Sequence, residues 1–88
     1  TGRSKIDEHV LALVAEIDER FPKERHQIAE YLERSQRRVS QMIEEAAKAS
    51  NTSAVTIHRR IYKAMIAGKT LSEALSVLEQ VKAWAEGK

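Results

Sequence analysis

Apolar residues recur at intervals of three and four along most of the chain, a spacing typical of amphipathic helices. The first stripe predicts a helix that is capped by Ser4, carries the acid of its first turn at Asp7, and ends before Pro22. The members of this stripe are Ile6, Val10, Leu13, Val14, Ile17 and Phe21.

Two shorter stripes follow. Proline is tolerated in a first helical turn, so Pro22 predicts the start of a short second helix, whose apolar residues are Ile28, Ala29 and Leu32. Ser35 then predicts the N-cap of a third helix that ends near Ala49. The apolar face of the third helix consists of Val39, Met42, Ile43, Ala46 and Ala47.

Turn-forming residues separate the third helix from two more. The fourth helix follows Ser50, Asn51, Thr52 and Ser53, and its inward side chains are expected to be Ile57, Ile61, Ala64 and Met65. Gly68 suits a left-handed helix end, and Thr70 with Glu73 forms a capping box for a fifth helix. No strand is expected, so the predicted fold class is all-α, with a trihelical core followed by C-terminal helices.

Length and composition indicate one soluble domain over residues 1–88. Apolar residues make up 42% and charged residues 32% of the chain, a balance typical of folded proteins. There is no cysteine, which excludes disulfides and thiolate metal sites, and no apolar run approaches the roughly 20 residues of a membrane helix. We therefore expect a cytoplasmic location. Because the first residue is Thr1, we interpret residues 1–4 as a cloning remnant and the chain as a piece of a longer protein.

The positive charge is concentrated in the middle of the chain. Residues 34–69 contain eight basic and two acidic side chains, a net charge of +6, whereas residues 1–33 carry −3 and residues 70–88 carry −1. This asymmetry is expected of a surface that meets phosphate groups, although cations on a helix are more often only its solvated face.

The segment between Gln27 and Ile43 has the spacing of two helices that cross over a three-residue turn. Such helices touch where a small residue on the first, here Ala29, meets a β-branched residue on the second, here Val39. In this spacing the chain resembles the helix-turn-helix DNA-binding superfamily. It departs from the usual pattern in the turn, where Glu33 replaces a glycine and Arg34 an apolar residue.

The resemblance implies that the exposed start of the third helix enters the major groove of DNA. The implied base-reading residues are Gln36, Arg37, Ser40 and Gln41. Arginine pairs with guanine and glutamine with adenine, while Ser35 and Arg38 are better placed to contact phosphate.

A second, overlapping register matches the same pattern and stays open on the sequence alone. It is formed by Ala47, Asn51, Ser53, Ile57 and Ile61. Its DNA-facing residues would be Ser53, Val55, Thr56, His58, Arg59 and Tyr62. Taken over both registers, the expected phosphate contacts are Arg34, Arg38, Lys48, Arg59, Arg60 and Lys63.

The fifth helix offers a further interface. Its apolar residues alternate in spacings of three and four, which fits either packing on the chain's own core or a homodimer contact. The residues of the dimer contact would be Leu71, Leu75, Leu78, Val81 and Trp84.

No pattern indicates an enzyme. The sequence GKT at residues 68–70 lacks the earlier glycine of a phosphate-binding loop, and the three histidines lie far apart in the sequence. We therefore expect no cofactor, metal, membrane or small-molecule substrate. The expected function is sequence-specific binding of double-stranded DNA, in transcription regulation, replication, partition or recombination. The alternative is a helical protein-interaction or dimerisation module, with RNA binding a weaker third possibility.

Overall fold

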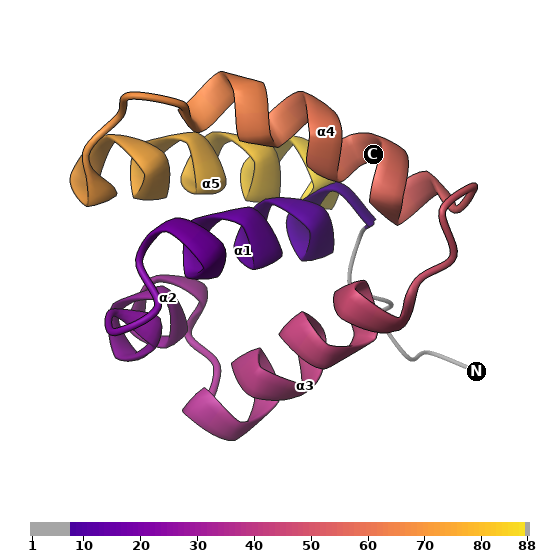
Figure 1. Ribbon diagram of the computed structural model, residues 1–88. Helices are drawn as coiled ribbons and strands as arrows, with labels where there is room; N and C mark the ends of the chain where they lie inside the picture. The colour runs from indigo at the N-terminus through magenta and orange to yellow at the C-terminus, as the bar shows by residue number, and fades with distance from the viewer. Residues whose placement is uncertain (1–7, 88) are drawn as a thin grey trace.

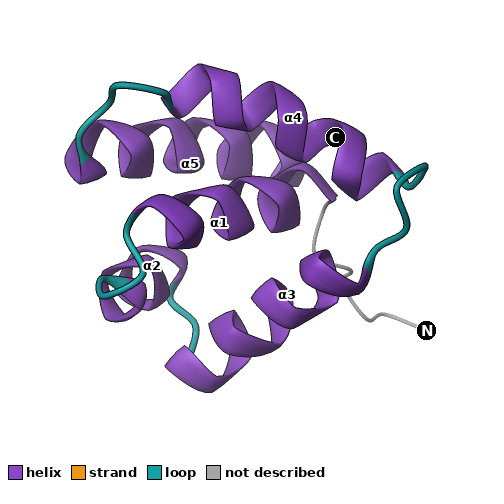
Figure 2. Cartoon of the chain, viewed as in Figure 1, coloured by secondary structure: helices purple, strands orange, loops and turns teal. Residues whose placement is uncertain are grey.

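The computed structural model describes residues 8–87, which form five α-helices joined by short turns and contain no strand (Figures 1 and 2). The helices are α1 (Glu8–Arg20), α2 (Arg25–Leu32), α3 (Gln36–Lys48), α4 (Ala54–Ile66) and α5 (Leu71–Glu86). The all-α prediction is confirmed. The expected cap Ser4, with Ile6 and Asp7, lies outside the described residues.

Helix α1 is the central element of the fold. Residues 10–18 are buried without interruption, because α1 packs against α3, α4 and α5 on different sides. The sequence predicted a single apolar stripe, but Leu11, Ala12 and Ala15 are buried as well. A helix that is apolar nearly all round belongs in the interior, and this explains the position of α1.

The predicted helix ends are confirmed at four places. The hydroxyls of Ser35, Ser53 and Thr70 each accept a hydrogen bond from the backbone N–H three residues further on, at 3.1 to 3.2 Å. Glu73 completes the capping box by accepting from the backbone N–H of Thr70 at 2.9 Å, a hydrogen bond that lowers the pKa of Glu73. Gly68 has φ +78°, the left-handed conformation expected after α4.

The predicted start of α2 is wrong by three residues. Pro22 lies in a turn between α1 and α2, and α2 begins only at Arg25. The backbone N–H of Glu24 donates to the carbonyl of Phe21 at 3.0 Å, so Pro22 occupies the second position of a four-residue turn. The fixed φ of proline suits that position as well as a first helical turn.

The predicted inner face of α4 is wrong. All four residues expected to point inward are exposed: Ile57, Ile61, Ala64 and Met65. Tyr62 and Ile66 are buried instead. Compared with the prediction, α4 is rotated about its own axis. The buried carboxylate of Glu16 on α1 needs a cationic partner, and this orientation of α4 turns Arg59 toward it.

The apolar seam of α5 faces the chain's own core. Leu75 and Leu78 are buried, and Leu71 and Val81 are partly buried against the same core. Only Trp84 is strongly exposed. Of the two roles that the spacing allowed, the structure therefore shows packing on the chain's own core for Leu71, Leu75, Leu78 and Val81, and α5 lies against α1.

Candidate nucleic-acid interface

Helices α2 and α3 pack against each other across a turn of three residues, Glu33, Arg34 and Ser35. Ala29 of α2 and Val39 of α3, the residues expected at the crossing, are both buried. The turn therefore holds α3 at a fixed position relative to α2.

Glu33 closes the end of α2 in the left-handed conformation, with φ 56° and ψ 41°. Its backbone N–H donates to the carbonyl of Glu30 at 3.1 Å, and that of Arg34 donates to the carbonyl of Ala29 at 3.0 Å. Only glycine adopts this conformation without strain against a Cβ atom.

Replacing Glu33 with glycine is expected to raise the free energy of unfolding by about 0.5 to 1 kcal/mol, because the strain at the Cβ atom is removed. The control is Glu33→Ala, which also loses the exposed contact of Glu33 with Lys82 at 3.9 Å but keeps a Cβ. Denaturant unfolding of both variants measures the difference. A gain for alanine equal to that for glycine would contradict the explanation.

Helix α3 turns its apolar face inward and its polar N-terminal half outward. Val39, Met42 and Ala46 are buried. The exposed residues in the turn and the first half of the helix are Arg34, Ser35, Gln36, Arg37 and Gln41. Five of the seven residues singled out between Arg34 and Gln41 are therefore open to solvent.

Ser40 is not open in the same way, because Arg25 engages it. The Arg25 guanidinium donates to the Ser40 hydroxyl at 2.9 Å and makes two hydrogen bonds, at 3.0 and 3.1 Å, to the carboxylate of Asp18. The hydrogen bond to Asp18 raises the pKa of Arg25. Arg25 thus ties α1, α2 and α3 together. Asp18 and Arg25 belong to different helices, so helical periodicity gave no signal for this contact.

Positive charge gathers at the N-terminal end of α3. Arg34 and Arg37 are exposed there, and Arg38 is half-buried, with its guanidinium 3.4 Å from the side-chain oxygen of Gln41. The N-terminus of a helix also carries a partial positive charge. The second half of α3 differs, since Glu44 and Glu45 are exposed on it.

The residues of the second register face the rest of the molecule. Tyr62 is buried, Val55 packs against the core, and the Thr56 hydroxyl donates to the carbonyl of Ser50 at 2.7 Å. The His58 ring stacks on that of His9, with 3.8 Å between the centroids. Helices α3 and α4 have almost no mutual contact. The expectation that this face of α4 points outward is therefore wrong, because α4 packs on α1.

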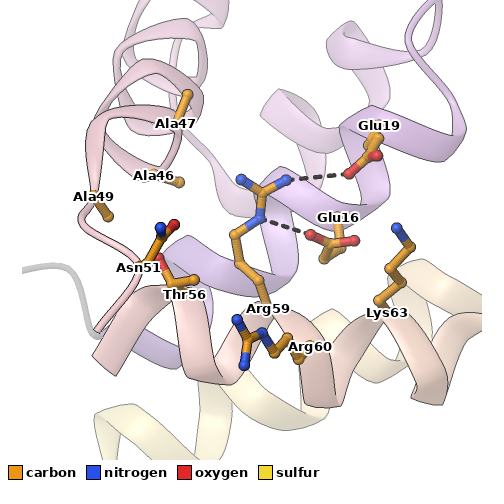
Figure 3. Close-up of a pocket in the computed structure, with 10 residues that line it drawn as sticks. All are labelled: Glu16, Glu19, Ala46, Ala47, Ala49, Asn51, Thr56, Arg59, Arg60 and Lys63. Atoms are coloured by element: carbon orange, nitrogen blue, oxygen red, sulfur yellow. Dashed lines mark hydrogen bonds and ion pairs between the residues drawn. The ribbon is translucent and has the colours of Figure 1, made fainter. Parts of the chain in front are cut away.

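Among the residues of the second register, Arg59 is the clearest case of a side chain that faces α1, because its guanidinium is held by two carboxylates of that helix (Figure 3). Its Nε donates to Glu16 at 2.6 Å and its Nη2 donates to Glu19 at 3.1 Å. The Glu16 side chain is 5% exposed and that of Arg59 is 25% exposed. The sequence offered one hint of this pair, an acid within the apolar run of the first helix.

The same contact lies in an open cleft of about 290 Å³ between α1, the end of α3 and α4. Arg60 and Lys63 line the α4 side of the cleft, opposite Ala47 (Figure 3). Ala47 is ten residues along α3 from Arg37, which is about 15 Å at the helical rise of 1.5 Å per residue. The cations of residues 34–69 therefore form two separate groups, not one continuous patch.

Two further features bear on the kind of site. Among residues 8–87, no group of three or more potential metal-binding side chains is positioned to hold an ion. None of the five helices is both long and apolar enough to cross a bilayer.

The chain was also compared with known proteins. A scan against protein-family models, a search of curated proteins and a search of solved structures each returned no match.

Proposed function

We propose that the protein binds double-stranded DNA in a sequence-specific manner, through α2, the turn and α3 acting as a helix-turn-helix unit. One observation carries the proposal. The first half of α3 presents Gln36, Arg37 and Gln41 to solvent, at the end of the helix that the three-residue turn and Arg25 hold in place. In this mode of binding, the N-terminal residues of the second helix contact base edges in the major groove.

The side chains have the chemistry that the groove requires. The Arg37 guanidinium can donate two hydrogen bonds to guanine, and each glutamine amide can both donate to and accept from adenine. Arg34 and Arg38 stand beside these groups, at the N-terminal end of α3. Such groups bind phosphate and set the position of the helix along the duplex.

Arg59 has no place in the proposed contact, because both carboxylates of its ion pair belong to α1. Arg60 and Lys63 lie by the other end of α3, where they would reach only flanking phosphates. The proposed role is one of binding and not of catalysis. A transcriptional regulator and the DNA-binding domain of a replication, partition or recombination protein would both use such a unit.

Selection from a library of random duplexes tests the proposal. A DNA-reading protein enriches one motif, and its affinity for that motif falls steeply as salt rises, because phosphate contacts release counterions. Failure to enrich any motif, or duplex binding that does not change with salt, would contradict the proposal.

Arg37→Ala is expected to weaken binding to the selected duplex by about 1 to 3 kcal/mol and to relax the preference at one base pair, because a bidentate contact is lost. The matched control is Arg60→Ala, which removes the same charge near the opposite end of α3. That variant is expected to keep the base preference and to lose affinity uniformly, if at all. Titration of both variants against the selected duplex and its single-base variants measures the effects. An equal loss of preference in the two variants would place the reading surface elsewhere.

A further inference from the structure

The outer face of α4 carries three large apolar side chains in the open. Ile57 is 48% exposed, Ile61 is 55% exposed and Met65 is 48% exposed. They follow one another at intervals of four residues, so they form one ridge of about 12 Å along the helix. Tyr62 and Ile66 are the buried residues of α4, so the three side chains of the ridge do not contribute to the core.

No charged group interrupts this face. By helical phase, the α4 residues beside the ridge are small, Ala54 and Ala64. The cations nearest in sequence, Arg60 and Lys63, line the cleft on the side of α4 toward α3. A surface without cations cannot serve phosphate, so this face is distinct from the proposed DNA contact.

Trp84 of α5 extends the apolar surface beside α4. The tryptophan is 52% exposed. Its ring is nearly perpendicular to that of His9, with 5.0 Å between centroids, and His9 in turn stacks on His58 of α4. Through these rings, Trp84 lies near His58 of the ridge-bearing helix.

We propose that a second copy of this chain docks on the outer face of α4, across a two-fold axis near Ile61. The ridge is symmetric along the helix, with one large residue four positions before Ile61 and one four positions after it. In an antiparallel pair, Ile61 meets Ile61 of the second copy, and Ile57 meets Met65 of the second copy. Each ridge can also settle in the shallow groove that the small side chain of Ala64 leaves beside the other, which is the ridge-into-groove packing most common between helices.

The size of the surface indicates how strong this association is. Four large side chains, each about half exposed, present on the order of 400 Å² of apolar surface per copy, taking about 200 Å² for a fully exposed side chain. A pair then buries about 800 Å² from these residues, below the roughly 1,200 Å² of a stable interface. The dimer is therefore weak and forms as the concentration rises.

The two proposed surfaces are compatible with each other. Helices α3 and α4 lie on opposite sides of α1 (Figure 1), and they have almost no mutual contact. Docking on α4 thus leaves the exposed half of α3 open. The self-association proposal stands on the α4 ridge alone and does not depend on DNA binding.

Sedimentation equilibrium of the whole chain, without DNA and from micromolar to millimolar concentration, tests the proposal. For the wild type, the average mass is expected to rise from the monomer value of 10.0 kDa toward twice that value. Ile61→Lys is expected to keep the mass at the monomer value, because it puts two like charges at the two-fold axis. The control is Glu30→Lys, which changes the net charge more but lies exposed on α2, and it is expected to associate like the wild type.

Circular dichroism of the three proteins shows whether each is folded, since Ile61 is exposed and its replacement should leave the helices intact. A wild type that stays monomeric at millimolar concentration overturns the proposal. So does equal association of the wild type and Ile61→Lys. Binding of the monomeric wild type to vesicles of anionic lipid would instead assign the ridge to a membrane surface, and would also overturn it.

Discussion

A chain that ends at Lys48 is expected to show no cooperative unfolding transition, although it contains α1, α2, the turn and α3 complete. Helices α4 and α5 contribute four large side chains to the core that surrounds α1, namely Tyr62, Ile66, Leu75 and Leu78. Their burial is worth roughly 6 to 12 kcal/mol, at about 1.5 to 3 kcal/mol per large side chain. The whole stability of a chain of this length is about 4 to 13 kcal/mol.

Circular dichroism during heating measures this loss, with the full chain as the reference. The control is a chain that ends at Gly87, which loses only the final lysine and should unfold like the full chain. A cooperative transition in the shorter chain, near the temperature of the full chain, would show that the first three helices are independently stable and that α1 is not shared as described.

Arg59→Ala is expected to lower the free energy of unfolding by about 3 kcal/mol. Removing one partner of a buried ion pair leaves the other charge uncompensated, which usually costs about 3 to 5 kcal/mol. The lower end applies here, because Glu16 lines an open cleft that can admit water once the guanidinium is gone. Denaturant unfolding gives the value.

Two further variants separate this effect from general damage to α4. Arg60→Ala, on the exposed side of the same helix, is expected to change the stability by less than about 0.5 kcal/mol. The double replacement Glu16→Leu with Arg59→Met is expected to recover most of the loss, because an apolar pair can replace a buried ion pair. If the double variant is less stable than Arg59→Ala, the stabilising role of Arg59 is something other than neutralising Glu16.

The helices and their ends could be predicted from the sequence because the signals are local. A hydroxyl cap such as Ser35 acts on a backbone N–H only three residues away, and Gly68 acts on its own backbone. Pro22 was the exception. It fits both a turn and a first helical turn, and local reasoning could not choose between them.

The orientation of α4 could not be predicted, because it depends on a residue 43 positions away. Judged by itself, the helix has its most apolar face at Ile57, Ile61 and Met65, and that face should be buried. The buried carboxylate of Glu16 favours the opposite orientation, with Arg59 inward. The long apolar run of the first helix was a usable clue, since Glu16, which interrupts it, needs a partner on another helix.

The candidate site was predicted in part, for the same reason. The exposure of Gln36, Arg37 and Gln41 follows from the helical period set by Val39 and its neighbours. The occupation of Ser40 by Arg25 does not follow from it, because that contact joins three helices. The net charge of residues 34–69 also does not say where in the fold each cation lies. The sequence therefore could not show that these cations form two separate groups.

The anchoring of α3 by Arg25 has a consequence for any partner of this helix. Because one guanidinium bonds to both Asp18 and Ser40, the helix cannot pivot on its turn without breaking contacts to α1. Its outer surface is thus preorganised, and association loses little conformational entropy in ordering the backbone. A partner of α3 would accordingly be recognised by a rigid body, with adjustment confined to the rotamers of a few long side chains.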